Sequence, residues 1–218
     1  MKKFLLILCG IILLSGCACK SNEFKESYEA LNGKENASGK IHRTISIDED
    51  NPFEKVEAEE IVKKIENNET FYVYFGDELC PWCRSVIEKF IEVAKKNKID
   101  KVYYVKIWDK DGNEILRDKY TLNDKDELEL SFKGTESYKK LLTYFDSFLS
   151  DYNLTDSKEN KVSCNEKRIF APNFVYVKDG KAVKLVEGIS SLQTDARGEL
   201  TKEILDEEES IFEEFFKK

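Results

Sequence analysis

Residues 71–84 read FYVYFGDELCPWCR, a continuous apolar run that leads into two cysteines, Cys80 and Cys83. An uninterrupted apolar run is typical of a strand that is covered on both faces. The residues that follow the pair repeat their apolar positions at helical spacing, namely Val86, Ile87, Phe90 and Ile91. The pattern predicts that the cysteine pair lies where a buried strand gives way to an amphipathic helix over 83–96.

This position has chemical consequences for the two sulfurs. The N-terminus of a helix carries a partial positive charge and unpaired N–H groups, which favour a thiolate. Pro81 suits the first helical turn because its missing N–H is not needed there. We expect Cys80 to be the more exposed thiol with the lower pKa, and Cys83 to lie one turn inside the helix. Asp77 and Glu78 oppose thiolate formation, although we expect them to be exposed and therefore screened.

Alternating strands and helices surround the motif. The apolar patterns predict strands over 53–56, 71–75 and 102–107, with helices over 58–67 and 83–96 between them. Strands that alternate with helices in this way are typical of an α/β fold with parallel pairing.

The second half of the chain contains a long insertion and then returns to the same pattern. Residues from 108 to about 163 are polar and turn-rich, with short hairpin strands and an amphipathic helix over 137–149. We interpret this helix as a cap on the protein's own core rather than a surface for a partner. A KDGK turn at 178–181 joins two apolar strands, and the last helix is expected over 200–216.

The N-terminus has the features of a bacterial export signal. Lys2 and Lys3 precede an apolar stretch over 4–14, which is too short for a permanent spanning helix. It ends in LSGC at 14–17, which resembles the lipobox of bacterial lipoprotein signal peptides. The resemblance implies cleavage before Cys17, which then carries a diacylglycerol thioether and an N-acyl chain such as palmitate. The alternative is an uncleaved anchor with a chance cysteine.

The export signal divides the chain into three parts. We expect a signal peptide over 1–16, a lipidated N-terminus and flexible tether over 17–50, and one folded domain over 51–218. The protein would then be lipid-anchored at the extracytoplasmic face of the cell membrane. His42, the only histidine, is interpreted as a solvated residue of the tether, which disfavours histidine-dependent hydrolase mechanisms. The net charge of −8 disfavours a nucleic-acid partner.

The cysteine pair has several possible uses. Cys9 is expected to leave with the signal peptide and Cys17 to carry the lipid, which leaves four unmodified cysteines, namely Cys19, Cys80, Cys83 and Cys164. Covalent haem needs a histidine after the second cysteine, where this chain has Arg84. A structural zinc site, which needs two further ligands, and an inert structural disulfide stay open as alternatives. Pro81 and Trp82 in a helix-opening loop favour a disulfide that opens and closes as part of its function.

Further spacings resemble the thioredoxin-like superfamily. Pro172 opens an apolar strand, Gly180 follows eight residues later, and Gly188 follows eight beyond that. The resemblance covers 53–107 and 167–217. It implies an α/β, thioredoxin-like fold with a central mixed β-sheet flanked by helices and a helical insertion before the cis-proline strand. The lipobox and FYVYFGDELCPWC are most similar to exported bacterial thioredoxin-like lipoproteins and the bacteriocin-transport accessory group.

The resemblance also implies a function, a membrane-anchored extracytoplasmic thiol–disulfide oxidoreductase. Its expected catalytic residues are Cys80 and Cys83, and its expected substrate-binding residues are Pro81, Trp82, Ala171 and a cis Pro172. The expected partners are protein thiols and disulfides, with a membrane electron donor if the protein works as a reductase. No metal or organic cofactor is required. The alternative is a non-catalytic accessory or binding lipoprotein on the same scaffold.

Two departures from the family pattern affect the site. Members often have a buried carboxylate six residues before the first cysteine, which helps proton transfer from the second; here that residue is Tyr74. We therefore expect slower or water-mediated proton transfer. The long insertion is expected to influence partner choice. Cys164 within it is interpreted as an ordinary buried thiol, with a third redox role or pairing to Cys19 as alternatives.

Overall fold

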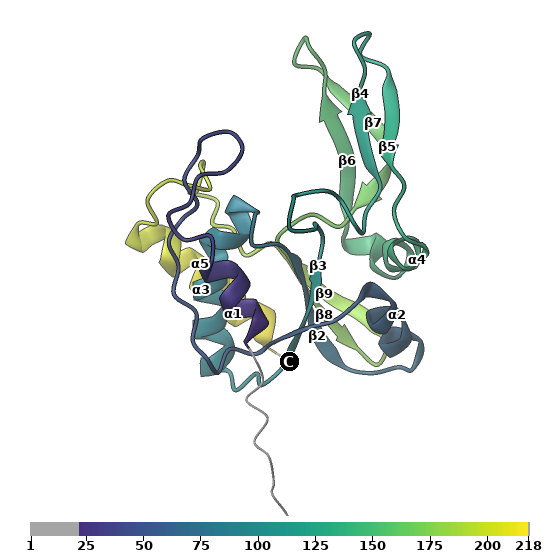
Figure 1. Ribbon diagram of the computed structural model, residues 1–218. Helices are drawn as coiled ribbons and strands as arrows, with labels where there is room; N and C mark the ends of the chain where they lie inside the picture. Colours follow the sequence, from purple (N-terminus) through teal and green to yellow (C-terminus); the bar gives the residue numbers. More distant parts are fainter. Residues whose placement is uncertain (1–21, 218) are drawn as a thin grey trace, which may run out of the picture.

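A five-stranded mixed sheet runs through the centre of the computed structural model, which describes residues 22–217 (Figure 1). Its strands, in the spatial order β1-β3-β2-β8-β9, are β1 (Phe53–Lys55), β3 (Val102–Lys106), β2 (Phe71–Gly76), β8 (Asn173–Lys178) and β9 (Lys181–Val186). The pairs β1–β3 and β3–β2 are parallel, whereas β2–β8 and β8–β9 are antiparallel. The expected α/β class, with a central mixed sheet flanked by helices, is confirmed.

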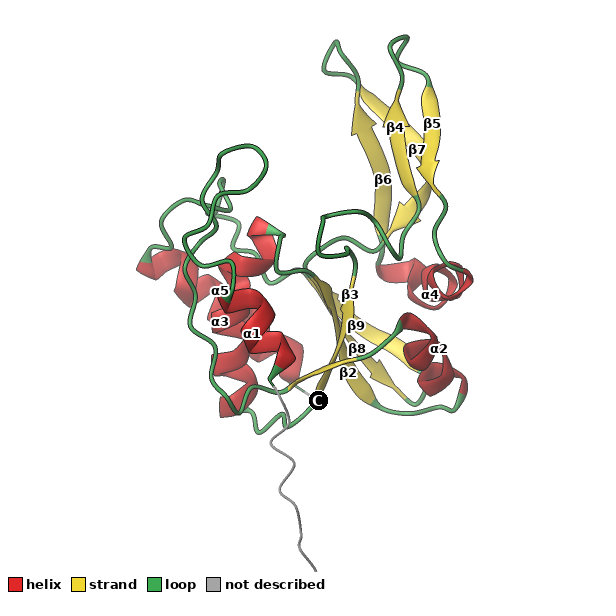
Figure 2. Cartoon of the chain, in the orientation of Figure 1, coloured by secondary structure: helices red, strands yellow, loops and turns green. Residues whose placement is uncertain are grey.

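Helices cover both faces of this sheet (Figure 2). One face carries α1 (Glu23–Glu29), α3 (Pro81–Lys96) and α5 (Lys202–Phe216), and the other carries α2 (Ala58–Glu66) and α4 (Glu136–Phe145). The middle strand β2 is buried on both faces, as its continuous apolar run predicts. Aromatic rings fill the layer between the sheet and α3: Phe90 stacks on Phe174 with ring centroids 4.2 Å apart. Cys80 and Cys83 belong to the same apolar cluster as these aromatic residues.

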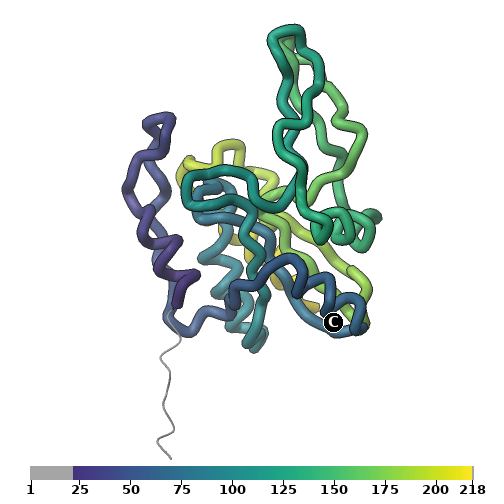
Figure 3. The backbone as a smooth tube through the Cα atoms, turned by 45° about the vertical axis from the view of Figure 1, so that its right-hand side comes forward, coloured from purple at the N-terminus to yellow at the C-terminus, as the bar shows by residue number. Residues whose placement is uncertain are grey.

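The insertion contains more strand than the sequence predicts. Beside α4 it contains a 3₁₀ turn, Asp146–Phe148, and two hairpins, β4 (Lys119–Leu122) with β5 (Leu128–Phe132) and β6 (Ser150–Thr155) with β7 (Lys161–Arg168). The hairpins lie side by side as an arm that projects away from the sheet (Figures 1 and 3), and Tyr120 meets Tyr152 between them. The expected end near residue 163 is therefore too early. The second hairpin has no clear apolar alternation because much of both its faces is exposed to solvent.

The prediction of a flexible tether over 17–50 is wrong for the part that the structure describes. Residues 22–50 pack against the domain through four buried apolar side chains, namely Phe24, Tyr28, Ile45 and Ile47. His42 is also buried, so its interpretation as a solvated residue is wrong as well. Phe24 and Tyr28 have helical spacing, but two residues are too short a pattern to predict that the segment packs on the domain.

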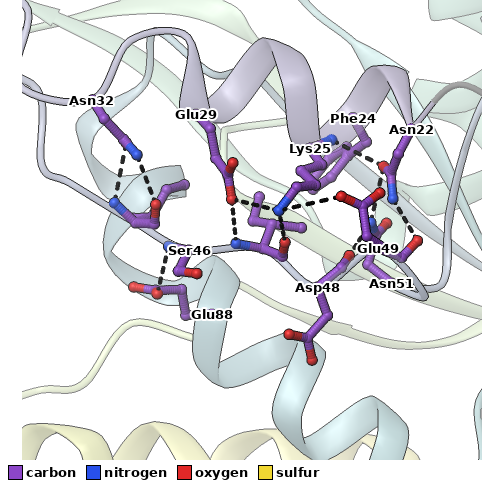
Figure 4. Close-up of polar contacts among 12 residues, drawn as sticks. Asn22, Phe24, Lys25, Glu29, Asn32, Ser46, Asp48, Glu49, Asn51 and Glu88 are labelled. Carbon is purple, nitrogen blue, oxygen red and sulfur yellow. Dashed lines mark hydrogen bonds and ion pairs between the residues drawn. The ribbon is translucent and has the colours of Figure 1, made fainter.

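Polar side chains hold this N-terminal segment in place (Figure 4). Asn22 caps α1 by accepting a hydrogen bond from the backbone of Lys25 at 3.1 Å. The Glu29 carboxylate accepts the backbone N–H of Ile47 at 2.7 Å. Asn32 donates to the backbone oxygen of residue 45 at 2.7 Å and accepts from its N–H at 3.1 Å. The backbone of residues 45–47 is therefore held beside α1 and the turn after it by hydrogen bonds from side chains.

The predicted export features lie outside the described residues. The signal peptide over 1–16, the lipidation site Cys17 and the neighbouring Cys19 all precede residue 22. Across 22–217, no helix has the length and apolar character needed to cross a bilayer.

Candidate functional site

The cysteine pair lies at the junction between β2 and α3, as predicted. Cys80 is the N-cap residue of α3, and its sulfur accepts a hydrogen bond from the backbone N–H of Cys83 at 3.3 Å. Both residues are free thiols. Cys80 is 4% exposed and Cys83 is fully buried, which confirms that Cys80 is the more exposed of the two thiols, although both are buried. The sulfur is covered because a second loop lies across it.

That second loop carries the cis peptide bond that the family resemblance implies. The Ala171–Pro172 peptide is cis. The Cys80 thiol donates to the backbone oxygen of Ala171 at 3.4 Å. Asn173 holds the loop from within, because its amide oxygen accepts the backbone N–H of Phe170 at 2.8 Å and its amide nitrogen donates to the Pro172 oxygen at 3.0 Å. The loop before β8 and the N-terminus of α3, which carry the predicted site residues, are therefore brought together.

The two thiols differ in acidity. The hydrogen bond from the Cys83 side chain lowers the pKa of Cys80, and the backbone N–H groups of Cys83 and Trp82 lower it further. Burial raises the pKa of Cys83 well above its ordinary value. Because the thiolate is the nucleophile, this asymmetry favours Cys80 as the attacking sulfur.

The remaining predicted residues form the rim around Cys80. Pro81, Trp82 and Ala171 are each half-buried, whereas Pro172 is buried. Half-buried side chains of this kind leave apolar surface for a partner beside the sulfur. Cys164 is a buried free thiol in β7 of the arm, which confirms its interpretation as a buried thiol.

Two acidic residues before the pair are buried, so the expectation that they are exposed is wrong. Asp77 is fully buried, and its carboxylate accepts the backbone N–H groups of Leu79 at 2.9 Å and Trp108 at 3.2 Å. Burial raises the pKa of Asp77 to about 7. Glu78 pairs with Lys106. The start of the insertion covers Asp77, and β3 side chains cover Glu78; a local sequence pattern does not reveal such long-range contacts.

Arg84 joins the site to the N-terminal segment, a relationship that the sequence does not predict. Its side chain is 1% exposed although no carboxylate pairs with it among the contacts of the described chain. The guanidinium donates to the backbone oxygens of Tyr28 at 2.8 Å and Arg43 at 3.0 Å, and to the Asn32 side chain at 2.6 Å. The apolar spacing of Phe24 and Tyr28 is the only sequence signal that suggests this packing.

Tyr74, which lies six residues before Cys80, where the thioredoxin-like pattern often has a carboxylate, is fully buried. Its hydroxyl lies 2.8 Å from the hydroxyl of Tyr28, and it lowers the pKa of Cys83. The interior side of the dithiol therefore meets phenol groups where the family pattern has a carboxylate.

The comparisons with known proteins assign no family. No protein-family model matches the chain, and a search of curated proteins also found no match. Within 22–217, no group of three or more His, Cys, Asp or Glu residues is arranged to hold a metal ion. The functional proposal consequently depends on the geometry of the cysteine pair and its surroundings.

Proposed function

We propose that the protein is a membrane-anchored extracytoplasmic thiol–disulfide oxidoreductase with a thioredoxin-like fold. The observation that carries this proposal is the position of the Cys80 thiol, at the N-cap of α3 and 3.4 Å from the oxygen of Ala171 in a cis-proline loop. A helix N-terminus favours the thiolate, and the second thiol needed to complete exchange lies one turn away.

The arrangement of the sheet supports the thioredoxin-like fold. Three parallel strands in the order β1-β3-β2 are followed by the antiparallel hairpin of β8 and β9. The cysteine pair follows β2, the central strand of the five. The fold places the end of β2 beside the start of β8, which is where the two loops of the site meet.

Exchange proceeds in two balanced steps. The Cys80 thiolate attacks one sulfur of a partner disulfide, so a Cys80–partner bond forms, the partner S–S bond breaks, and the electron pair leaves on the partner's other sulfur, which takes up a proton. The Cys83 sulfur then attacks Cys80, the Cys80–partner bond breaks, and the partner leaves as its second thiol with the proton that Cys83 has lost. The dithiol is oxidised by two electrons and the partner disulfide is reduced. The reverse sequence oxidises a partner dithiol.

The rim supplies a binding surface for an extended partner chain. Ala171, held by the cis Pro172, presents backbone groups next to the reacting sulfur, and backbone pairing is how extended peptides are commonly bound. Pro81 and Trp82, which follow Cys80 directly and are half-buried, add apolar surface beside it. The arm of the insertion, whose base adjoins this loop, is proposed to influence which protein partners fit.

Anchoring explains where such a protein would act. Cleavage before Cys17 and lipidation of its sulfur would hold the domain at the outer face of the cell membrane, where disulfides persist. A reductase at this location would need a membrane electron donor, whereas an oxidase would need an electron acceptor. The exchange itself requires no metal or organic cofactor.

Trapping of the mixed disulfide tests the proposal. Cys83→Ser should accumulate protein adducts on Cys80 that a reductant releases, because the second step is blocked. Cys80→Ser is the negative control, and Cys164→Ser is the matched control that should behave as wild type. Absence of adducts, together with no turnover of a model disulfide by the intact protein, would instead support the non-catalytic binding lipoprotein. Zinc in the reduced protein would support a metal site.

A further inference from the structure

The inner cysteine of the pair shares a buried cluster with a tyrosine. Tyr74 projects from β2 toward α3, and both Tyr74 and Cys83 are fully buried in the same cluster. The Tyr74 hydroxyl lies tightly over Gly76, where an added Cβ would be only 2.0 Å away from it. Glycine at this position therefore allows the ring to lie along its own strand, inside the buried cluster that also contains Cys83, and the Tyr74 hydroxyl lowers the pKa of Cys83.

A second tyrosine, Tyr28, sets the direction in which the Tyr74 hydroxyl donates its hydrogen bond. The hydroxyls of Tyr28 and Tyr74 are 2.8 Å apart, and Tyr28 is also fully buried. Each hydroxyl has one proton to donate, and a Cys83 thiolate can only accept. The chain of donors must therefore run from Tyr28 to Tyr74 to Cys83. Arg84 fixes Tyr28 in place, because its guanidinium donates to the Tyr28 backbone oxygen at 2.8 Å.

We propose that Tyr74 is a catalytic residue of the dithiol site and Tyr28 its positioning residue: the Tyr74 hydroxyl donates to the Cys83 sulfur and stabilises it as the thiolate that attacks Cys80. This inference rests on the proposed exchange function. It assigns the N-terminal segment a chemical role, because α1 supplies Tyr28. Removal of the Cys83 proton still goes through water, as expected, and the phenol adds stabilisation of the thiolate that this removal leaves behind.

The balance of forces on Cys83 is consistent with this role. Burial raises the pKa of Cys83, and the hydrogen bond to Cys80 raises it further, whereas the Tyr74 hydroxyl and the backbone N–H of Asp77 lower it. A hydrogen bond to a charged acceptor is stronger than one to a neutral group. Its loss is expected to slow formation and attack of the thiolate about tenfold.

The step involved is the second half of the exchange. Cys83 loses its proton and attacks the Cys80 sulfur of the mixed disulfide; the Cys80–Cys83 bond forms and the Cys80–partner bond breaks. The partner sulfur leaves with the electron pair and takes up one proton. Tyr74 keeps its own proton throughout, so the phenol acts as a hydrogen-bond donor and not as an acid.

Other ionisable groups also face this cluster, and their effects on a pH profile must be distinguished from those of the tyrosines. They come from each surrounding element, namely Cys80 and Arg84 from α3, Tyr104 and Lys106 from β3, and Asp77 and Glu78 from the loop after β2. Asp77 titrates near pH 7, whereas the pKa of Cys83 is raised well above its ordinary value. The two transitions are therefore distinguishable in a pH profile.

The test measures release of a chromogenic aromatic thiol, 2-nitro-5-thiobenzoate, from a mixed disulfide on Cys80 of the Cys164→Ser chain. Release by Cys83 is followed from pH 6 to 10. Tyr74→Phe should slow release about tenfold at neutral pH and move the rise in rate about one unit higher. Tyr28→Phe should act in the same direction but less. Tyr72→Phe, which removes a hydroxyl from the same strand and the same face, is the matched control and should leave the profile unchanged.

A double variant separates chemistry from folding. Tyr28→Phe with Tyr74→Phe removes both hydroxyls together, so no buried hydroxyl is left unpaired and stability should stay near that of wild type. The inference predicts that release stays slow in this double variant. It is overturned if the profiles of Tyr74→Phe and the double variant superimpose on that of wild type, or if the double variant regains the wild-type rate. Absence of release from the wild-type site would instead contradict the proposed exchange function itself.

Discussion

The Cys80 thiol contacts the backbone oxygen of Ala171 at 3.4 Å although 91 positions separate the two residues. The register of the sheet explains this contact. β2 and β8 are antiparallel neighbours with Phe75 opposite Asn173, so the end of one strand and the start of the other lie at the same edge of the sheet. The motif that follows β2 and the cis-proline loop that precedes β8 therefore face each other across the candidate site.

Asp77 is expected to control the reactivity of Cys80 near neutral pH. Burial raises the Asp77 pKa to about 7, and its ionised carboxylate raises the pKa of Cys80. Asp77→Asn should therefore lower the Cys80 pKa, remove an inflection near pH 7 from the rate of iodoacetamide alkylation, and increase that rate about two- to threefold at pH 8. Asp124→Asn, at an exposed position of the arm, is the control. An unchanged profile for Asp77→Asn would contradict this electrostatic coupling.

Arg84 is predicted to hold the N-terminal segment on the domain. Arg84→Met leaves three buried acceptors, on Tyr28, Arg43 and Asn32, without their donor. The expected loss is about 3 kcal/mol or more in the free energy of unfolding, measured in urea. Limited proteolysis should at the same time cut within 22–51. Lys96→Ala on the exposed side of α3 should cost less than about 1 kcal/mol, and an equal effect of the two variants would refute the prediction.

The arm is fixed at its base by a buried ionic cluster. Glu114 lies between Arg117 at 2.8 Å and Arg168 at 3.2 Å, with all three side chains almost fully buried. Glu114→Ala leaves two buried guanidinium groups without a counter-charge, and we expect a loss of about 3–5 kcal/mol in unfolding free energy. Glu136→Ala, which removes an exposed pair with Lys139, should cost less than about 1 kcal/mol. Similar losses of unfolding free energy in both variants would show that burial does not determine how much an ion pair contributes to stability.

Glu208 should make the protein less stable as pH rises. Its side chain is fully buried, and both carboxylate oxygens lack a hydrogen-bond partner among the described residues. Burial raises its pKa from 4.5 to about 7, so the folded state binds the proton more tightly than the unfolded state. Its stabilising contribution is complete below about pH 4.5 and is lost as pH rises to about 7.

Glu208→Gln should reduce the loss of stability that accompanies the rise in pH. At pH 8 the variant is expected to be about 1–2 kcal/mol more stable than wild type, once partial solvent screening is allowed for. The measurement is urea unfolding from pH 4 to 8, taken as the difference between variant and wild type because Asp77 titrates in the same window. Glu209→Gln, a partly exposed carboxylate on the same helix, should not flatten the curve. Parallel curves for Glu208→Gln and wild type would contradict the assignment.

The sequence predicts the site's local chemistry well because that chemistry depends on neighbours along the chain. The apolar run of β2 and the helical spacing after Cys83 placed the thiol pair correctly at a strand–helix junction. The lower pKa of Cys80 follows from the Cys83 side chain and from adjacent backbone N–H groups, all of which are close in the sequence. The meeting of the cis-proline loop with Cys80 was predictable only through the family resemblance, because it depends on strand pairing between distant segments.

What the sequence does not predict depends on distant chain segments. The burial of Asp77 requires the start of the insertion to fold over it, and the burial of His42 requires residues 22–51 to pack on α3. Tyr28 reaches Tyr74 across 46 positions, and no periodic pattern joins them. The second hairpin of the arm, β6 with β7, could not be predicted because its largely exposed strands lack an apolar alternation.

The most direct test of the central claim is an equilibrium redox titration of the full chain in glutathione buffers, read by mass after alkylation of free thiols. A reversible two-electron exchange site predicts one transition in which Cys80 and Cys83 form a disulfide with each other, at a potential between about −270 and −120 mV. Cys164→Ser should give the same transition. If Cys80 and Cys83 stay reduced throughout, or if Cys80 is oxidised without Cys83, the pair is not an exchange site.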